Sequence, residues 1–118
     1  MNNEDFHKEK REFVRYGLKA RGEICFEEGI RHNGVFHDIS VAGAFFETAD
    51  IDEVSVNQFV TMSMNAEIKG ELHNMISKCK IVRVTNTGVG MLFGKMDDRS
   101  KTTFHALMQE LRDNLIKS

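Results

Sequence analysis

Apolar and polar residues alternate along most of the chain, in short stretches separated by glycine and asparagine. Successive side chains of a strand point to opposite faces of a sheet, so this period of two predicts β-strands with one buried face. The sequence contains no proline that would interrupt strand pairing. We therefore predict about six strands, near residues 18–26, 35–39, 43–48, 59–66, 75–85 and 89–93. The first turn should run from Glu28-Gly29 to Asn33-Gly34, and the acidic stretch 49–56 should be a loop.

A different period begins after Asp97. Apolar residues then recur three and four positions apart, which predicts one apolar stripe on a helix over residues 98–117. Asp97, Asp98 or Ser100 can cap its first turn. Six antiparallel strands followed by one helix predict an all-β fold with a C-terminal helix. We expect the strands to form a small closed or nearly closed β-barrel, with the helix packed on the end or the side of the barrel.

Composition restricts the kinds of function. The 118 residues provide one domain with one core, and 16 basic against 18 acidic residues give a net charge of −2. The chain as a whole therefore has no electrostatic reason to bind DNA, RNA or an anionic membrane. No apolar run approaches the roughly 20 residues of a membrane span, and the first residues lack the pattern of a secretory signal. We expect a cytoplasmic protein without membrane insertion.

Cysteine and histidine show no spacing that indicates chemistry. Cys25 and Cys79 stand in apolar surroundings, where two small buried side chains are expected rather than a disulfide or a metal ligand. The five histidines show no spacing typical of a metal site. We predict no cofactor and no metal.

Charge is distributed unevenly along the chain. Between Lys8 and Arg21 there are six basic and two acidic residues, whereas the segment from Ala44 to Met75 is strongly acidic. An anion should therefore bind near the N-terminal segment. That segment is rich in charge and poor in apolar anchors, so we predict a flexible N-terminal arm over residues 1–16 and a barrel domain over residues 17–118.

Two arginines of the arm are candidates for anion binding. Arg11 and Arg15 stand four positions apart, and each offers a planar fork of donors that can pair with a phosphate or lie flat on a purine ring. A basic arm that is merely solvated would show the same spacing, so this pair alone does not establish a site.

The segment from Asp38 to Gly43 is the second candidate. If Ile39 and Val41 face the core, alternation directs Asp38 and Ser40 to the outer surface. An exposed carboxylate can accept hydrogen bonds from N1 and N2 of guanine, and a hydroxyl can bind phosphate or ribose. Gly43 would let the chain turn or let a ligand approach closely. The alternative is a solvated strand face that simply ends at Gly43.

Together the two segments resemble the signature of the PilZ family, the bacterial cyclic di-GMP receptor domains, in which RxxxR is followed some two dozen residues later by [D/N]xSxxG. Here Asp38 follows Arg15 by 23 residues, and every defining position of both motifs is present. The run Gly88-Val89-Gly90-Met91-Leu92-Phe93 and the terminal helix also look like PilZ counterparts. The resemblance implies a six-stranded antiparallel β-barrel with a C-terminal helix, in agreement with the strand pattern.

The resemblance also implies a ligand and the residues that bind it. Arg11 and Arg15 would clamp the guanine and the phosphates of cyclic di-GMP. The other side of the ligand would be held on the outer surface of the barrel by Asp38, Ser40 and Gly43.

Lys10 stands at the position that biases PilZ proteins toward one ligand molecule or an intercalated pair, and a basic side chain there favours the pair. The implied function is a non-enzymatic receptor or adaptor in second-messenger signalling. Ligand binding would order the N-terminal arm, and the changed surface would signal to an effector protein, such as motility, exopolysaccharide or pilus machinery.

Other functions are compatible with a small barrel. Some PilZ-like domains bind no nucleotide and act as protein-interaction adaptors, although those usually lack the arginines or the [D/N]xSxxG run. Binding of single-stranded nucleic acid is disfavoured because the chain is acidic overall and contains no tryptophan and only one tyrosine. An enzyme is not expected, because alternation places His37 toward the core or the barrel rim and Ser40 on the opposite face.

Overall fold

The computed structural model describes residues 14–49 and 54–117, which form one closed barrel and one helix. The elements are β1 (Tyr16–Phe26), β2 (Arg31–Ile39), β3 (Gly43–Glu47), β4 (Phe59–Ile68), β5 (Glu71–Val84), β6 (Gly88–Phe93) and α2 (Asp98–Lys117). Around the barrel the strands follow the order β1-β2-β3-β6-β5-β4, and every neighbouring pair is antiparallel. The predicted six-stranded barrel with a C-terminal helix is confirmed.

The first hairpin differs from its prediction. Its turn is confined to residues 27–30, β2 already begins at Arg31, and Gly34 lies inside β2 rather than in the turn. Gly29, with a φ of 94°, provides the positive φ of the turn. Gly34 is required for another reason, since a Cβ at this position would lie 2.1 Å from the carbonyl oxygen of Glu47. The glycine therefore marks a close approach of β2 to β3.

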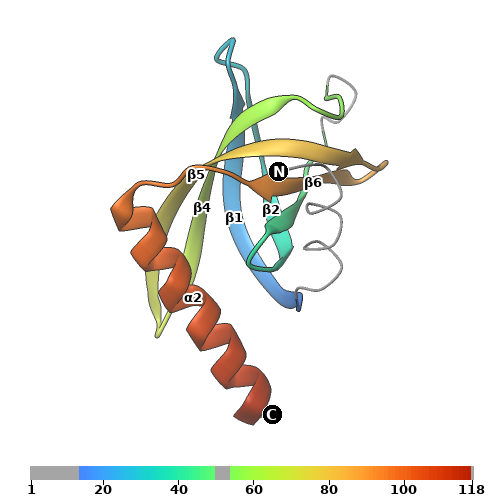
Figure 1. Ribbon diagram of the computed structural model, residues 1–118. Coiled ribbons are helices and arrows are strands. Elements are labelled where there is room, and N and C mark those ends of the chain that lie inside the picture. The colour runs from blue at the N-terminus through green and yellow to red at the C-terminus, as the bar shows by residue number, and fades with distance from the viewer. Residues whose placement is uncertain (1–13, 50–53, 118) are drawn as a thin grey trace, which may run out of the picture.

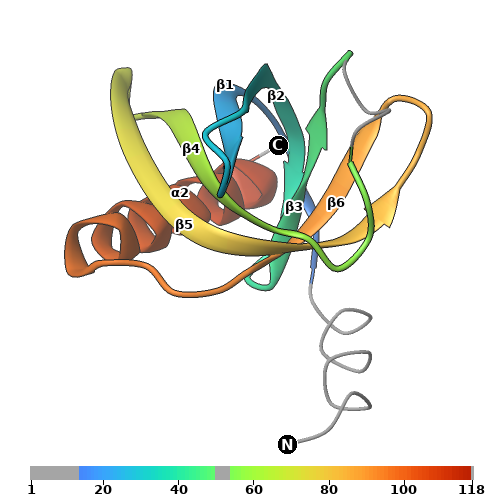
Figure 2. The same cartoon turned by 90° about the horizontal axis from the view of Figure 1, so that it is seen from above.

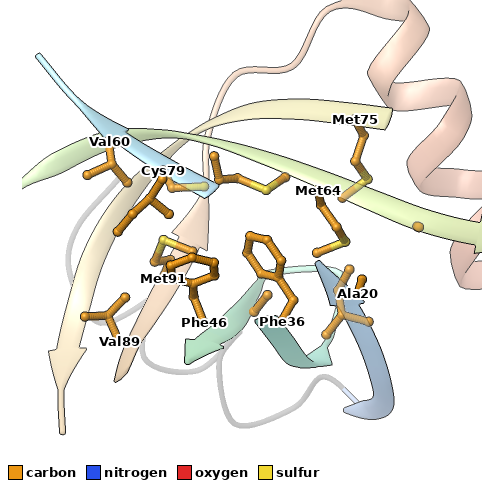
Figure 3. Close-up of a cluster of buried hydrophobic side chains, with 14 of the residues drawn as sticks. Ala20, Phe36, Phe46, Val60, Met64, Met75, Cys79, Val89 and Met91 are labelled. Carbon is orange, nitrogen blue, oxygen red and sulfur yellow. The ribbon is translucent and has the colours of Figure 1, made fainter. Parts of the chain in front are cut away.

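The interior of the barrel is filled by aliphatic, aromatic and sulfur-containing side chains (Figure 3). Phe36 and Phe46 pack at its centre with their ring centroids 4.7 Å apart. Four fully buried or nearly buried methionines complete this core: Met62, Met64, Met75 and Met91. Cys79 is buried among them as predicted, and its burial raises the pKa of the thiol to about 12, so this cysteine is an inert packing group. Cys25 is only half-buried, and both cysteines are free.

Helix α2 packs along the side of the barrel formed by β4 and β5 (Figure 1). Its apolar stripe is buried there through Phe104, Leu107 and Met108, as the three-and-four spacing predicts. Phe104 meets Phe93 edge-on at 5.4 Å between centroids. Among the three candidates for the cap, Asp97 is the residue used, because its Oδ1 accepts a hydrogen bond from the Ser100 amide at 2.7 Å. Hydrogen bonds from the backbone and the side chain of Ser100 lower the pKa of Asp97.

The helix also covers a strand edge that β6 leaves open. Strand β5 is longer than β6, whose pairing with β5 begins only at Cys79. Ahead of that point, the Ile76 amide donates to Oγ of the fully buried Ser100 at 2.9 Å, and Arg99 donates to the Asn74 carbonyl at 2.9 Å. Backbone groups of a free edge are otherwise open to pairing with other chains, so the first turn of α2 completes the barrel wall.

Replacement of Ser100 by alanine should therefore destabilise the fold. The Ile76 amide would lose its acceptor in a partly buried place, and such an unpaired group costs about 1 kcal/mol, the lower end of the range for a buried one. We expect the free energy of unfolding, measured by urea titration followed by circular dichroism, to fall by that amount. The control is Thr102→Ala, because the exposed hydroxyl of Thr102 only donates to the Asp98 carbonyl within the helix. If both variants lost the same free energy of unfolding, the hydrogen bond from Ile76 to Ser100 would not stabilise the edge of β5.

Candidate functional site

The start of β1 and the end of β2 bring the two predicted binding segments together. Tyr16 pairs with Ile39 and Gly17 pairs with Asp38, so Arg15 emerges directly beside the end of β2. Nη1 of Arg15 donates to Oδ1 of Asp38 at 2.8 Å, although the two residues are 23 positions apart. Arg11 and Lys10, the other basic candidates, lie outside the described residues. The structure therefore brings together one motif arginine and the motif aspartate.

The ion pair between Arg15 and Asp38 is easily opened. The side chains of Arg15 and Asp38 are 43% and 36% exposed to solvent. Ion pairs that are open to solvent contribute only about 0–1 kcal/mol to stability. The pair thus holds both groups in place at little energetic cost to a ligand that separates them. Both the guanidinium and the carboxylate remain available for new partners.

Ser40 directly follows β2 and Gly43 begins β3, and the predicted exposed position of Ser40 is wrong. Ser40 is only 3% exposed. Its Oγ accepts from the amides of Ala42 and Gly43 at 3.1 and 3.3 Å, while its own amide donates to the Gly43 carbonyl at 2.8 Å. Val41 is exposed instead of buried, because β2 ends at Ile39 and alternation stops there. In this structure, the serine and the glycine shape the turn.

A β-bulge in β2 puts two consecutive residues, His37 and Asp38, on the outer face. Phe36 and Ile39 are both fully buried although they are three positions apart, and the register between β2 and β3 shifts after Phe36. The two residues between them, His37 and Asp38, are therefore both on the outer face. Asp38 lies outside as predicted, whereas the core-facing placement of His37 is wrong. Nε2 of His37 lies 2.5 Å from Oε1 of Glu47 on the outer surface.

A second bulge brings Arg83, which the sequence analysis missed, to the same face. The register between β5 and β6 shifts after Ile81, so Arg83 is exposed although alternation from the buried Ile81 would turn it inward. The guanidinium carbon of Arg83 lies 5.6 Å from the centroid of the Phe45 ring, within the range of a cation–π contact. No local residue type marks a bulge at this place, so periodicity could not have identified Arg83.

Strand register puts these groups in one row across the outer face. Asp38 pairs with Phe45, Phe45 pairs with Gly90, and Gly90 pairs with Arg83. Beside this row lies a narrow crevice, lined by Arg15, Ser40, Ala42, Gly43, Ala44, Phe45, Val82, Arg83, Gly90, Met91 and Leu92. Its volume is only about 10 Å³, enough for a single water molecule. The crevice is therefore too small to enclose a nucleotide.

Within residues 14–49 and 54–117, no helix covers this face. Helix α2 packs against β4 and β5 on one side of the barrel, whereas the turn between β5 and β6 lies on the other side, as Figures 1 and 2 both show. Across residues 14–49 and 54–117, no group of three or more histidine, cysteine or acidic side chains could hold a metal ion. Nor does that part of the chain contain a helix long and apolar enough to cross a bilayer. Within the part of the chain that the structure describes, the site is an open surface with two cations, Arg15 and Arg83, and one carboxylate, Asp38.

Comparison with known proteins identifies the family. The family model of the PilZ domain matches residues 9–110, which is most of the chain, so this chain belongs to the PilZ domain family. PilZ domains are a family of cyclic di-GMP receptor and adaptor domains. The matched residues include both arginines of the first motif and the whole second motif. The resemblance seen in the sequence is confirmed.

Solved structures show the same fold. The inhibitor of motility MotI/DgrA of Bacillus subtilis superposes with a TM-score of 0.69 at 16% identity, over 91% of this chain and 52% of that protein, so the chain spans about half its length. The PilZ domain of CeSA from a cellulose-synthesizing bacterium superposes with a TM-score of 0.62 at 18% identity, over 85% of this chain and 96% of that one. No curated protein sequence matches the chain.

Proposed function

We propose that this protein is a receptor for cyclic di-GMP that signals to an effector protein and carries out no reaction itself. The observation that carries the proposal is the meeting of Arg15 and Asp38 at 2.8 Å on an open barrel surface. A guanine base presents two donors, N1 and N2, that a carboxylate such as Asp38 can accept. Phosphates require fixed cations, for which the planar guanidinium of Arg15 is suited.

The strength of such contacts agrees with second-messenger binding. Hydrogen bonds to charged groups contribute about 1.5–3 kcal/mol each. A micromolar dissociation constant corresponds to about 8 kcal/mol. A few bonds from Arg15 and Asp38, together with Arg11 and Lys10 from the arm, are therefore sufficient for affinity in this range. Ser40 and Gly43 contribute by fixing the turn that supports Asp38.

No catalytic step is proposed for this site. The Ser40 hydroxyl is buried and already accepts two backbone hydrogen bonds, so it is not presented as a nucleophile. His37 faces outward against Glu47 rather than against Ser40. Signalling would instead follow from ordering, in the bacterial cytoplasm, of the arm that precedes β1; Tyr16, which was predicted to belong to the arm, is already part of β1, and residues 1–13 lie outside the described residues. The ordered arm would present a new surface to the effector.

Isothermal titration calorimetry with cyclic di-GMP tests the proposal. We expect the wild-type protein to bind with a micromolar dissociation constant. Asp38→Ala should weaken binding by about tenfold or more, because a charged hydrogen bond is lost. The matched control is Glu23→Ala, which removes a carboxylate that is paired with Arg31 at 3.0 Å on the outer surface away from the site. A folded wild-type protein that gives no heat would overturn the proposal and favour a nucleotide-independent adaptor.

A further inference from the structure

Arg83 is held in a defined position and has no ionic partner among residues 14–49 and 54–117. Its guanidinium lies over the Phe45 ring, as described above, and its side chain is exposed. No carboxylate lies within ion-pair distance of it in residues 14–49 and 54–117. A cation that the protein positions but does not neutralise is available to a ligand.

The side chain of Arg83 lies close to the surface over Gly90. A Cβ at Gly90 would stand 3.5 Å from both Cβ and Nε of Arg83, so the arginine stem passes directly over this residue. The side chain therefore runs from β5 across the bare backbone of β6 and ends over Phe45 on β3. Phe45 supports the guanidinium from below and leaves its other side open to solvent.

The position of the Arg83 guanidinium relative to Asp38 suggests which group of a ligand would bind there. Phe45 is the direct register partner of Asp38, and neighbouring strands lie about 4.8 Å apart. The Arg83 guanidinium, which lies over the Phe45 ring, is therefore next to the strand position that carries Asp38. A base whose edge donates to Asp38 would lie with its flat face against the Arg83 guanidinium.

We infer that Arg83, supported by Phe45 and Gly90, is the surface on which a guanine base of the ligand stacks, while Asp38 binds the edge of the same base. The inference rests on the proposed function and adds to it the residue that selects a purine. Arginine stacks on flat π-systems as well as pairing with anions. A purine has a larger face than a pyrimidine, so this contact favours purine dinucleotides.

Calorimetry with cyclic di-GMP on three variants tests the inference. Removal of one stacked base typically costs about 1–3 kcal/mol, so Arg83→Ala should weaken binding by about tenfold or more. Arg83→Lys keeps the charge but lacks the plane, and it should lose as much affinity as Arg83→Ala. Phe45→Leu should weaken binding by a few-fold, because it removes the support. The matched control is Arg112→Ala, which removes an exposed arginine of α2 and should bind like the wild type.

The outcomes separate the inference from the proposed function. If the wild type binds and Arg83→Ala binds equally well, or if Arg83→Lys retains full affinity, stacking on Arg83 is excluded. Nuclear magnetic resonance provides a second readout, since a stacked guanine should shift the Arg83 δ-methylene signals upfield through its ring current. Unshifted signals at saturation would also overturn the inference. Absence of any binding by the folded wild type would instead overturn the proposed function, and this inference with it.

Discussion

Arg15→Ala is expected to weaken cyclic di-GMP binding by about a hundredfold or more, which would remove measurable heat at tens of micromolar ligand. The guanidinium would lose one or two charged hydrogen bonds of about 1.5–3 kcal/mol each, and every 1.4 kcal/mol is about tenfold in affinity. The variant would also leave the Asp38 carboxylate without its counter-ion beside the phosphates of the ligand. Calorimetry under the conditions used for the wild type measures the effect.

A closely matched control is available on the same barrel. Arg31 donates to Glu23 at 3.0 Å in an exposed pair, which is the same kind of contact as that between Arg15 and Asp38. Arg31→Ala should keep wild-type affinity. Arg15→Lys should recover only part of the loss, because an ammonium cannot pair in the bidentate way of a guanidinium. Binding by Arg15→Ala that equals the wild type would remove Arg15 from the site.

Gly43→Ala is expected to reduce the free energy of unfolding by about 3 kcal/mol, the upper part of the range for overpacking a tight structure. A Cβ at this position would lie 1.9 Å from the Met91 carbonyl oxygen, and both groups belong to the backbone of paired strands. No rotation of a side chain can relieve this contact, so β3 would have to move away from β6. Urea unfolding followed by circular dichroism measures the loss.

Gly17→Ala is the control for this prediction. A Cβ at Gly17 meets nothing within 4 Å, and Gly17 is not among the residues with positive φ. Its stability should therefore stay within about 0.5 kcal/mol of the wild type. If Gly43→Ala proved as stable as Gly17→Ala, the close approach of β3 and β6 at Gly43 would be wrong. The comparison also separates loss of fold from loss of ligand contacts, because a folded Gly43→Ala could still be titrated.

The barrel and the helix could be predicted because their signals are repeated many times. Alternation over each strand and the three-and-four spacing of Phe104, Leu107 and Met108 are each set by burial of several side chains. Glu71 to Asn74 extend β5 beyond its predicted start although they are mainly exposed, because the two-residue turn at Lys69-Gly70 pairs them with β4. Pairing across a hairpin is a tertiary effect that a count of apolar positions misses.

The site was predictable only in part, because single-residue irregularities determine it. Alternation from Ile39 gave the correct side for Asp38 but the wrong side for His37, since a bulge separates Phe36 from Asp38. The bulge after Ile81 likewise turns Arg83 outward, which alternation did not predict. The proximity of Arg15 and Asp38 was implied by the family resemblance, whereas the spacing of the residues by itself could not show that Gly17 pairs with Asp38.

The two bulges concern the charged groups of the outer face and not the packing of the barrel interior. Each adds one residue to a strand, and each turns one charged group, Asp38 or Arg83, outward beside the ring of Phe45. Loss of a single residue at either bulge would restore regular pairing there. A one-codon deletion of Asp38 or of Arg83 would thus leave a regularly paired barrel that lacks one charged group of this outer face. Insertions and deletions, rather than substitutions alone, are therefore informative when relatives of this chain are compared.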